Sequence, residues 1–227
     1  NGFVYRSSFN PSANRFESFQ PTSLNPPLYK PYAFDVSEDG STIVMAGEKP
    51  RGTLHTPFSY DGGRTWRDLK LGQRPILVTD IVRIPGTTSF LLNVGNRRSA
   101  DPQYYLANLN PEEKTEKALP VNYPSSAYQK NEVLISRVDR VNTQVEIISV
   151  KGEFGILIDT VNYQTGKLVR RGKLDSKLRL GAGLATYVDS SFNSHIITSD
   201  LKDRMLHDVN RDTGEIRLLP YSDWVRG

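Results

Sequence analysis

The chain has 227 residues, of which 37% are hydrophobic, 24% are charged and none is cysteine. This length allows one sizeable core or a compact repeat array, and the composition is that of a soluble globular protein rather than a disordered one. The missing cysteines exclude disulfides, thiolate metal sites and cysteine nucleophiles. The longest apolar runs, at residues 89–92 and 155–158, are only strand-sized, so we expect no membrane span.

The net charge of +4 comes from 29 basic and 25 acidic residues. Clustered lysines and arginines would favour a nucleic-acid partner, because they release counterions when they bind phosphates. Here the two signs are interspersed, and the densest basic run, at residues 170–173 with Lys177 and Arg179, is typical of a solvated strand or loop. We therefore do not expect nucleic acid to be the partner.

Two features bear on the compartment. The sequence starts at Asn1 rather than at a methionine, so we expect that an N-terminal targeting segment is absent from this chain. The one Asn-x-Ser/Thr match, at Asn10, contains Pro11 and cannot accept a glycan. Together these features favour a bacterial protein that is periplasmic or secreted.

Strand signals dominate the chain, and helix signals are scarce. Short apolar runs separated by turn residues predict hairpins, because residues such as Gly and Asn supply the backbone angles that a tight turn needs. The predicted hairpins join residues 33–36 to 41–46, 76–84 to 89–94, 133–141 to 145–150 and 184–188 to 195–199. Each is followed by a more polar hairpin whose turn contains Gly or Asn.

These polar turns recur at intervals of about 50 residues, and an Asn or Asp near the start of a turn can accept hydrogen bonds from the amides that follow. A repeat of this length with four short strands is typical of a β-propeller blade. We predict an all-β fold, a β-propeller of about five four-stranded blades, with a β-sandwich as the alternative. The residues expected to be left-handed in the five turns are Asn14, Gly63, Glu113, Gly166 and Gly214.

The predicted repeat units lie within a single domain, 1–227. They are residues 1–25, a partial unit, and then 32–72, 76–121, 133–175 and 183–223. The partial unit supplies only the outer two strands of a blade. Two explanations stay open: the chain is cut from a longer propeller, or another stretch such as residues 21–31 completes the partial blade.

One turn has a more specific sequence, SYDGGRTW at residues 59–66. It fits the pattern Ser-x-Asp-x-Gly-x-Thr-Trp and resembles the Asp box, or BNR repeat, of sialidase-like β-propellers. The resemblance implies a structural role in the outer part of a blade, in which the Asp binds backbone amides and the Trp fills space between neighbouring sheets. It implies no catalytic role for that Asp. The matching residues are Ser59, Asp61, Gly63, Thr65 and Trp66.

A second segment resembles the Arg-Ile-Pro strand of the same family, whose arginine binds the substrate carboxylate. Arg83 is the matching arginine, and Arg97 and Arg98 follow it. A planar guanidinium suits a carboxylate because it donates two parallel hydrogen bonds. The order departs from that of the family, since this strand follows the Asp box here. Arg83 is therefore a candidate ligand-binding residue, and a solvated strand residue is the alternative.

Metal and nucleophile signals are weak. The histidines, His55, His195 and His207, lack the short spacing of a metal site, so we expect strand or surface residues and no metal. No Gly-x-Ser-x-Gly segment predicts a nucleophile. We expect no cofactor and do not expect an enzyme.

We predict a non-catalytic propeller that binds a partner protein through rim loops, such as a bacterial envelope inhibitor or immunity protein. The alternative is a glycan-binding protein or a sialidase-like glycoside hydrolase. The candidate contact loops are residues 49–58, 96–105 and 123–131, because they combine Tyr and Arg, which are enriched at binding hot spots. The candidate ligand-binding residues are Arg83, Arg97, Arg98, Tyr104 and Tyr105.

Overall fold

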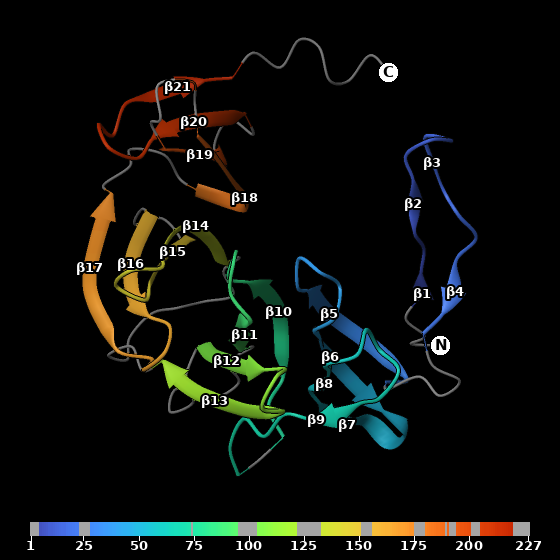
Figure 1. The fold of residues 1–227 in the computed structure, drawn as a ribbon. Helices are drawn as coiled ribbons and strands as arrows, with labels where there is room; N and C mark the ends of the chain where they lie inside the picture. The colour runs from blue at the N-terminus through green and yellow to red at the C-terminus, as the bar shows by residue number, and fades with distance from the viewer. Residues whose placement is uncertain are drawn as a thin grey trace. The chain divides into compact units, whose positions relative to one another are not determined.

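The computed structural model forms two compact units, residues 1–95 with 104–120 and residues 96–103 with 121–227, whose strands are shown in Figure 1. We describe each unit by itself. None of the helices in the described residues has the length and apolar character needed to cross a bilayer. The structure describes residues 5–22, 28–73, 75–94, 104–121, 133–150, 156–174, 180–188, 190, 194–200 and 205–219.

Unit 1 begins with a long hairpin of four short strands. β1 (Tyr5–Arg6) pairs with β4 (Gln20–Pro21), and β2 (Phe9–Asn10) pairs with β3 (Arg15–Phe16), all antiparallel. At the tip, Asn10 Oδ1 accepts a hydrogen bond from the Ala13 amide at 3.1 Å, and Asn14 is left-handed with φ 47°. We call residues 5–22 the N-terminal hairpin.

Two antiparallel sheets complete unit 1. Their buried side chains, among them Phe58 and Phe90, pack into one core cluster. In the first sheet the strands are β5 (Lys30–Val36), β6 (Ile43–Lys49), β8 (Pro57–Ser59) and β9 (Arg67–Asp68), with β7 (Thr53–His55) also paired to β6 and η1 (Pro50–Gly52) before it. In the second sheet they are β10 (Val78–Arg83), β11 (Ser89–Val94), β12 (Tyr104–Asn110) and β13 (Thr115–Val121).

Unit 2 contains two further four-stranded antiparallel sheets. Strands β14 and β18, which come first in their sheets, lie next to each other. One sheet consists of β14 (Val133–Asp139), β15 (Gln144–Val150), β16 (Ile156–Asn162) and β17 (Leu168–Leu174). The other consists of β18 (Leu180–Val188), β19 (Ser194–Asp200), β20 (Leu206–Asn210) and β21 (Ile216–Leu218).

The order of strands within each of these sheets follows the chain, which is the topology of a propeller blade. A sandwich with Greek-key connections would break that order. The predicted fold class, an all-β chain of four-stranded propeller blades, is therefore confirmed. The division into repeat units and the single domain stay predictions. The predicted hairpins correspond to β5–β6, β10–β11, β14–β15 and β18–β19.

The outer turns share one hydrogen-bond pattern. An Asn side-chain oxygen accepts bonds from the amides two and three residues further on in the turns that begin at Asn110, Asn162 and Asn210. In each of these turns the left-handed residue is the fourth after the Asn. In the third turn it is Lys114, at φ 54°, so the prediction of Glu113 is wrong by one residue: the Glu113 amide is occupied by Asn110.

Candidate functional site

The turn after β8 is a closed network of hydrogen bonds. Ser59 Oγ accepts a bond from the Gly63 amide at 2.8 Å and donates one to Asp61 Oδ1 at 2.7 Å. Asp61 Oδ1 also accepts bonds from the amides of Arg64 and Thr65, while its Oδ2 accepts one from Thr65 Oγ1 at 2.6 Å. Both carboxylate oxygens are thus used inside the turn, which we call the Asp-box turn.

Trp66 follows this turn and is partly buried. It packs with Leu28, Ile43 and Met45, which come from β6 and from the residues just before β5. Its indole Nε1 is buried and has no hydrogen-bond partner among the described residues. That Trp66 fills space between neighbouring sheets stays a prediction.

The charge of Asp61 predicts a pH dependence. Burial acts to raise the pKa of Asp61, but hydrogen bonds from Thr65, Ser59 and Arg64 outweigh it, so the pKa lies below its usual value. Such a carboxylate stabilises the fold above its unfolded pKa, near 4, and this contribution is lost as the pH falls through the lower folded pKa. Asp61→Asn keeps an acceptor oxygen, as in the Asn turns, but removes the charge.

We expect the stability difference between the wild type and Asp61→Asn, measured by urea denaturation, to shrink as the pH falls from neutral to below about 4. Asp61→Ala removes the acceptor as well, so it should lose about 1 kcal/mol even in acid. If the stability difference between the wild type and Asp61→Asn stays constant across this pH range, the charge of Asp61 does not stabilise the fold.

The predicted ligand-binding residues lie in different surroundings. Arg83 ends β10, where its amide donates to Asp35 Oδ2 at 2.7 Å and its Nη1 lies 3.8 Å from Glu38 Oε1. Its guanidinium therefore has an acidic neighbour from the turn between β5 and β6. Tyr104 and Tyr105, which begin β12, are buried, with exposed fractions of 4% and 6%. Arg97 and Arg98 lie outside the described residues, and a ligand-binding role for the set stays a prediction.

The first predicted contact loop, residues 49–58, contains more strand than we expected. It forms η1, β7 and the start of β8. Asp68 Oδ2 on β9 contacts both Lys49 Nζ at 2.7 Å and His55 Nδ1 at 3.1 Å, so this segment is fastened to its sheet. The loop at 123–131 lies outside the described residues, as does the loop at 96–105 except for its last two residues.

The N-terminal hairpin carries a group of exposed phenylalanines that the sequence patterns did not single out. Phe9, Phe16 and Phe19 are 50%, 62% and 63% exposed. The rings of Phe9 and Phe16 meet edge to face across the β2–β3 pair, with their centroids 5.3 Å apart. The rings of Phe16 and Phe19 are stacked, with their centroids 6.4 Å apart. We call these three residues the aromatic cluster. Contiguous exposed apolar side chains mark interaction sites.

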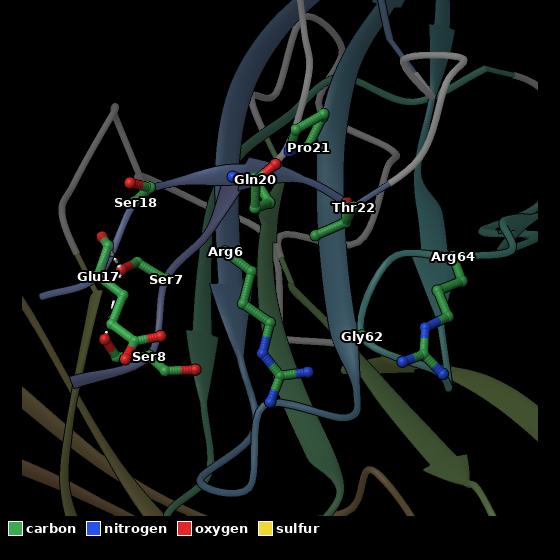
Figure 2. Close-up of a pocket in the computed structure, with 10 residues that line it drawn as sticks. All are labelled: Arg6, Ser7, Ser8, Glu17, Ser18, Gln20, Pro21, Thr22, Gly62 and Arg64. Atoms are coloured by element: carbon green, nitrogen blue, oxygen red, sulfur yellow. Dashed lines mark hydrogen bonds between the residues drawn. The ribbon is translucent and has the colours of Figure 1, made fainter. Parts of the chain in front are cut away.

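A pocket of about 310 Å³ lies between the N-terminal hairpin and the Asp-box turn (Figure 2). Its walls are rich in hydroxyl and charged groups. In the view of Figure 2, the side chains of Arg6 from the hairpin and Arg64 from the turn lie on either side of Gly62. The lining residues are Arg6, Ser7, Ser8, Glu17, Ser18, Gln20, Pro21, Thr22, Gly62 and Arg64.

Two glycines make room for Arg6. A Cβ placed on Gly62 would lie 3.1 Å from Arg6 Nη1, and one on Gly40 would lie 3.8 Å from Nη2. Both glycines have positive φ, 68° and 71°, which other residues rarely adopt. Within the described part of the chain, the guanidinium groups of Arg6 and Arg64 make neither a hydrogen bond nor an ion pair.

The three histidines all lie in strands. His195 Nδ1 lies 2.8 Å from Asp208 Oδ1 in unit 2, and both side chains are buried. Among the residues that the structure describes, no three His, Cys, Asp or Glu side chains group closely enough to hold a metal ion.

The fold and the pocket define an all-β protein of propeller blades with a polar pocket beside an exposed aromatic hairpin. No protein-family model matches the sequence, and the curated proteins contain no match. Among solved structures, the chain is similar to one described as Bacteroides ovatus Xyloglucan PUL GH43B. The TM-score is 0.47 and the sequence identity is 13%, over 86% of this chain and 42% of that chain. This chain thus spans less than half of the length of the protein that it resembles.

Proposed function

We propose that this chain is a non-catalytic binding module and that the N-terminal hairpin is its contact surface for a partner protein. The observation that carries the proposal is the aromatic cluster, whose three rings are at least half exposed and held together by contacts with each other. Aromatic side chains supply much of the binding energy at protein interfaces, because they bury a large area at a small cost in conformational entropy. The rim loops stay a prediction, and the hairpin is the surface proposed from the described residues.

The charges around the aromatic cluster indicate the chemistry of the partner. Arg6 and Arg64 place two positive charges in the adjoining pocket with no ion pair to any described residue, and Glu17 is the one acidic residue among those that line it. A positive surface favours a negative one through electrostatic complementarity. The proposed partner therefore presents apolar side chains flanked by acidic groups.

The aromatic cluster is tested with the double variant Phe16→Ser/Phe19→Ser. The wild type and the variant are used as bait in extracts of the source organism, and a captured protein is then purified for titration. We expect the variant to bind that protein at least about tenfold more weakly, because aromatic hot-spot residues contribute this much to binding. Its stability to urea should match that of the wild type, since both rings are exposed.

Val141→Ser is the matched control, because Val141 is 92% exposed and lies in unit 2. This control should capture the partner as well as the wild type does. Equal capture by the wild type and the Phe16→Ser/Phe19→Ser variant would show that the aromatic cluster is not the contact surface.

A glycan ligand is the second candidate, and the hydroxyl-rich lining of the pocket favours it. Sugars are bound by polar groups placed beside aromatic platforms, and Tyr5 is 56% exposed next to Arg6 on β1. Affinity electrophoresis in gels that contain neutral polysaccharides tests for binding, and incubation with the same polysaccharides tests for hydrolysis. Retardation by a polysaccharide that Tyr5→Ala abolishes would replace the protein partner with a glycan.

The proposal also includes the family to which the chain belongs and its role in the cell. The Asp-box turn supports membership of the Asp-box, sialidase-like propellers, since Asp61 and Ser59 bind the turn as that motif requires. A role as a bacterial inhibitor or immunity protein, in the periplasm or outside the cell, agrees with a binding module. Fractionation of the source cells, followed by detection with an antibody, tests this localisation, and recovery in the cytoplasm alone would exclude it.

A further inference from the structure

Two arginines line the pocket, and neither pairs with an acidic side chain in the part of the chain that the structure describes. Arg6 comes from β1 and Arg64 from the Asp-box turn, so the chain brings them together from segments far apart in sequence. Arginine side chains on protein surfaces commonly pair with carboxylates of the same chain, as Arg67 does with Glu116 at 2.9 Å in this unit. Arg6 and Arg64 make no such pair among the described residues. Their ten hydrogen-bond donors are available to a ligand.

We propose that this pocket binds a carboxylate on an acidic side chain of the partner protein, and that Arg6 and Arg64 hold it. The inference rests on the proposed function. A guanidinium donates two parallel hydrogen bonds to a carboxylate, and two guanidinium groups can together neutralise and orient one. The hydroxyl groups of Ser8 and Ser18 line the same pocket and add neutral donors.

The position of Arg6 supports a site that exists before the ligand arrives. Its guanidinium lies over Gly62 and Gly40, where a Cβ on the first would be only 3.1 Å away. The Asp-box turn that carries Gly62 and Arg64 is itself fixed by the hydrogen bonds to Asp61. A turn that is already fixed loses less conformational entropy on binding, so the affinity gains from this arrangement.

The surroundings favour a protein carboxylate over that of an acidic glycan. The aromatic cluster lies on the same hairpin as Arg6, and phenyl rings without hydroxyl groups suit apolar side chains of a protein. The pocket volume of about 310 Å³ lies at the lower end for ligand sites, so a single acidic side chain fits better than a chain of sugar rings.

Poly-L-glutamate is the probe for the site, titrated by calorimetry into the wild type and into Arg6→Gln/Arg64→Gln. We expect the double variant to bind at least about tenfold more weakly, because each charged hydrogen-bonded contact contributes about that factor. The control Arg51→Gln/Arg170→Gln removes the same charge from two exposed residues elsewhere and should bind as the wild type does. Urea denaturation should show equal stability for all three proteins. Equal weakening in both double variants would overturn the site, because it would show an effect of net charge alone.

Glu17→Gln should change poly-L-glutamate binding in the opposite direction to the arginine substitutions. Glu17 lines the pocket, and its backbone is fixed by bonds to Ser7 and Ser8, so the carboxylate stays near an incoming ligand. Removing that like charge should tighten poly-L-glutamate binding about threefold. Unchanged or weaker binding would contradict a carboxylate in this pocket.

A second probe, polygalacturonate, separates the sources of the carboxylate. Preference for poly-L-glutamate supports the protein ligand, whereas stronger binding of polygalacturonate that depends on Arg6 and Arg64 would overturn it in favour of an acidic glycan. The test is independent of the capture experiment above. If neither polymer binds while capture still depends on the aromatic cluster, the carboxylate site fails alone. If capture fails while the arginines still bind poly-L-glutamate, the proposed partner surface fails alone.

Discussion

Gly47→Ala should be among the most destabilising single substitutions in unit 1, with an expected loss of about 3 kcal/mol in the free energy of unfolding. Gly47 lies in β6 opposite Pro31 of β5, beside an irregularity in the pairing between Pro31 and Ala33. A Cβ on Gly47 would be 2.3 Å from the Lys30 carbonyl oxygen and 2.8 Å from the Pro31 Cα. Because both contacts are with backbone, no rotamer change relieves them, and β5 must move away from β6.

The same Cβ would also lie 3.0 Å from Leu28 Cδ1, which packs with Trp66. Urea denaturation followed by tryptophan fluorescence therefore reports on the substitution. Gly52→Ala is the control, because Gly52 has φ 74° with nothing within 4 Å of an added Cβ. That variant isolates backbone strain and should lose about 1 kcal/mol. If Gly47→Ala lost no more than Gly52→Ala, the close approach of β5 would not matter to stability.

The repeated turns were predictable because their chemistry is local. An Asn or Ser oxygen binds amides only a few residues away, so the left-handed position follows at a fixed distance in sequence. Asn14, Gly63, Gly166 and Gly214 were placed correctly for this reason. Lys114 was missed because no glycine or asparagine stands at the left-handed position of this turn to mark it, whereas counting four positions from Asn110 gives the right residue.

The close approach at Gly47 was not predictable in the same way. A glycine inside an apolar strand indicates that some other group comes near. The identity of that group, the backbone around Lys30 and Pro31, depends on the register of β5 against β6. Register follows from the whole pairing and from the irregularity near Pro31, neither of which the local pattern contains.

The candidate site was missed for a related reason. Arg6 and Arg64 are 58 positions apart in the sequence, and each taken alone is an ordinary polar residue of a turn or strand. Their common pocket depends on where the N-terminal hairpin lies against the Asp-box turn. One signal was available: residues 9–19 contain three phenylalanines, separated by small and polar residues, and no other large apolar side chain. A short hairpin of this kind has no second apolar face to form a core, so exposed rings could have been expected.

In unit 2 we expect Arg211→Met to lose about 3 kcal/mol in the free energy of unfolding, because it removes the positive charge that pairs with the buried carboxylate of Glu146. Arg211 follows β20 and pairs through Nη2 with Glu146 of β15, so the pair joins the two sheets of the unit. The two side chains are only 19% and 10% exposed. Burial acts to lower the pKa of Arg211, but Glu146 and Asp212 outweigh it, and the pKa lies above its usual value. The arginine is therefore charged at every pH at which the protein can be studied.

The double variant Arg211→Met/Glu146→Leu distinguishes two causes of the loss in stability: the missing ion pair itself, and the cost of a buried charge that has lost its counterion. Once both charges are replaced by apolar groups, neither Arg211 nor Glu146 is left as a buried ion without the other, and the second carboxylate that Arg211 contacts, Asp212, is 49% exposed. Stability should therefore return to within about 1 kcal/mol of the wild type. Arg217→Met is the control for removing an arginine, since its ion pair with Glu215 is 69% and 55% exposed and should contribute less than about 1 kcal/mol. Urea denaturation of the wild type, Arg211→Met, Glu146→Leu and the double variant completes the cycle. If the double variant lost as much stability as the two single variants together, the two residues would act independently. The packing of the two sheets would then not depend on this ion pair.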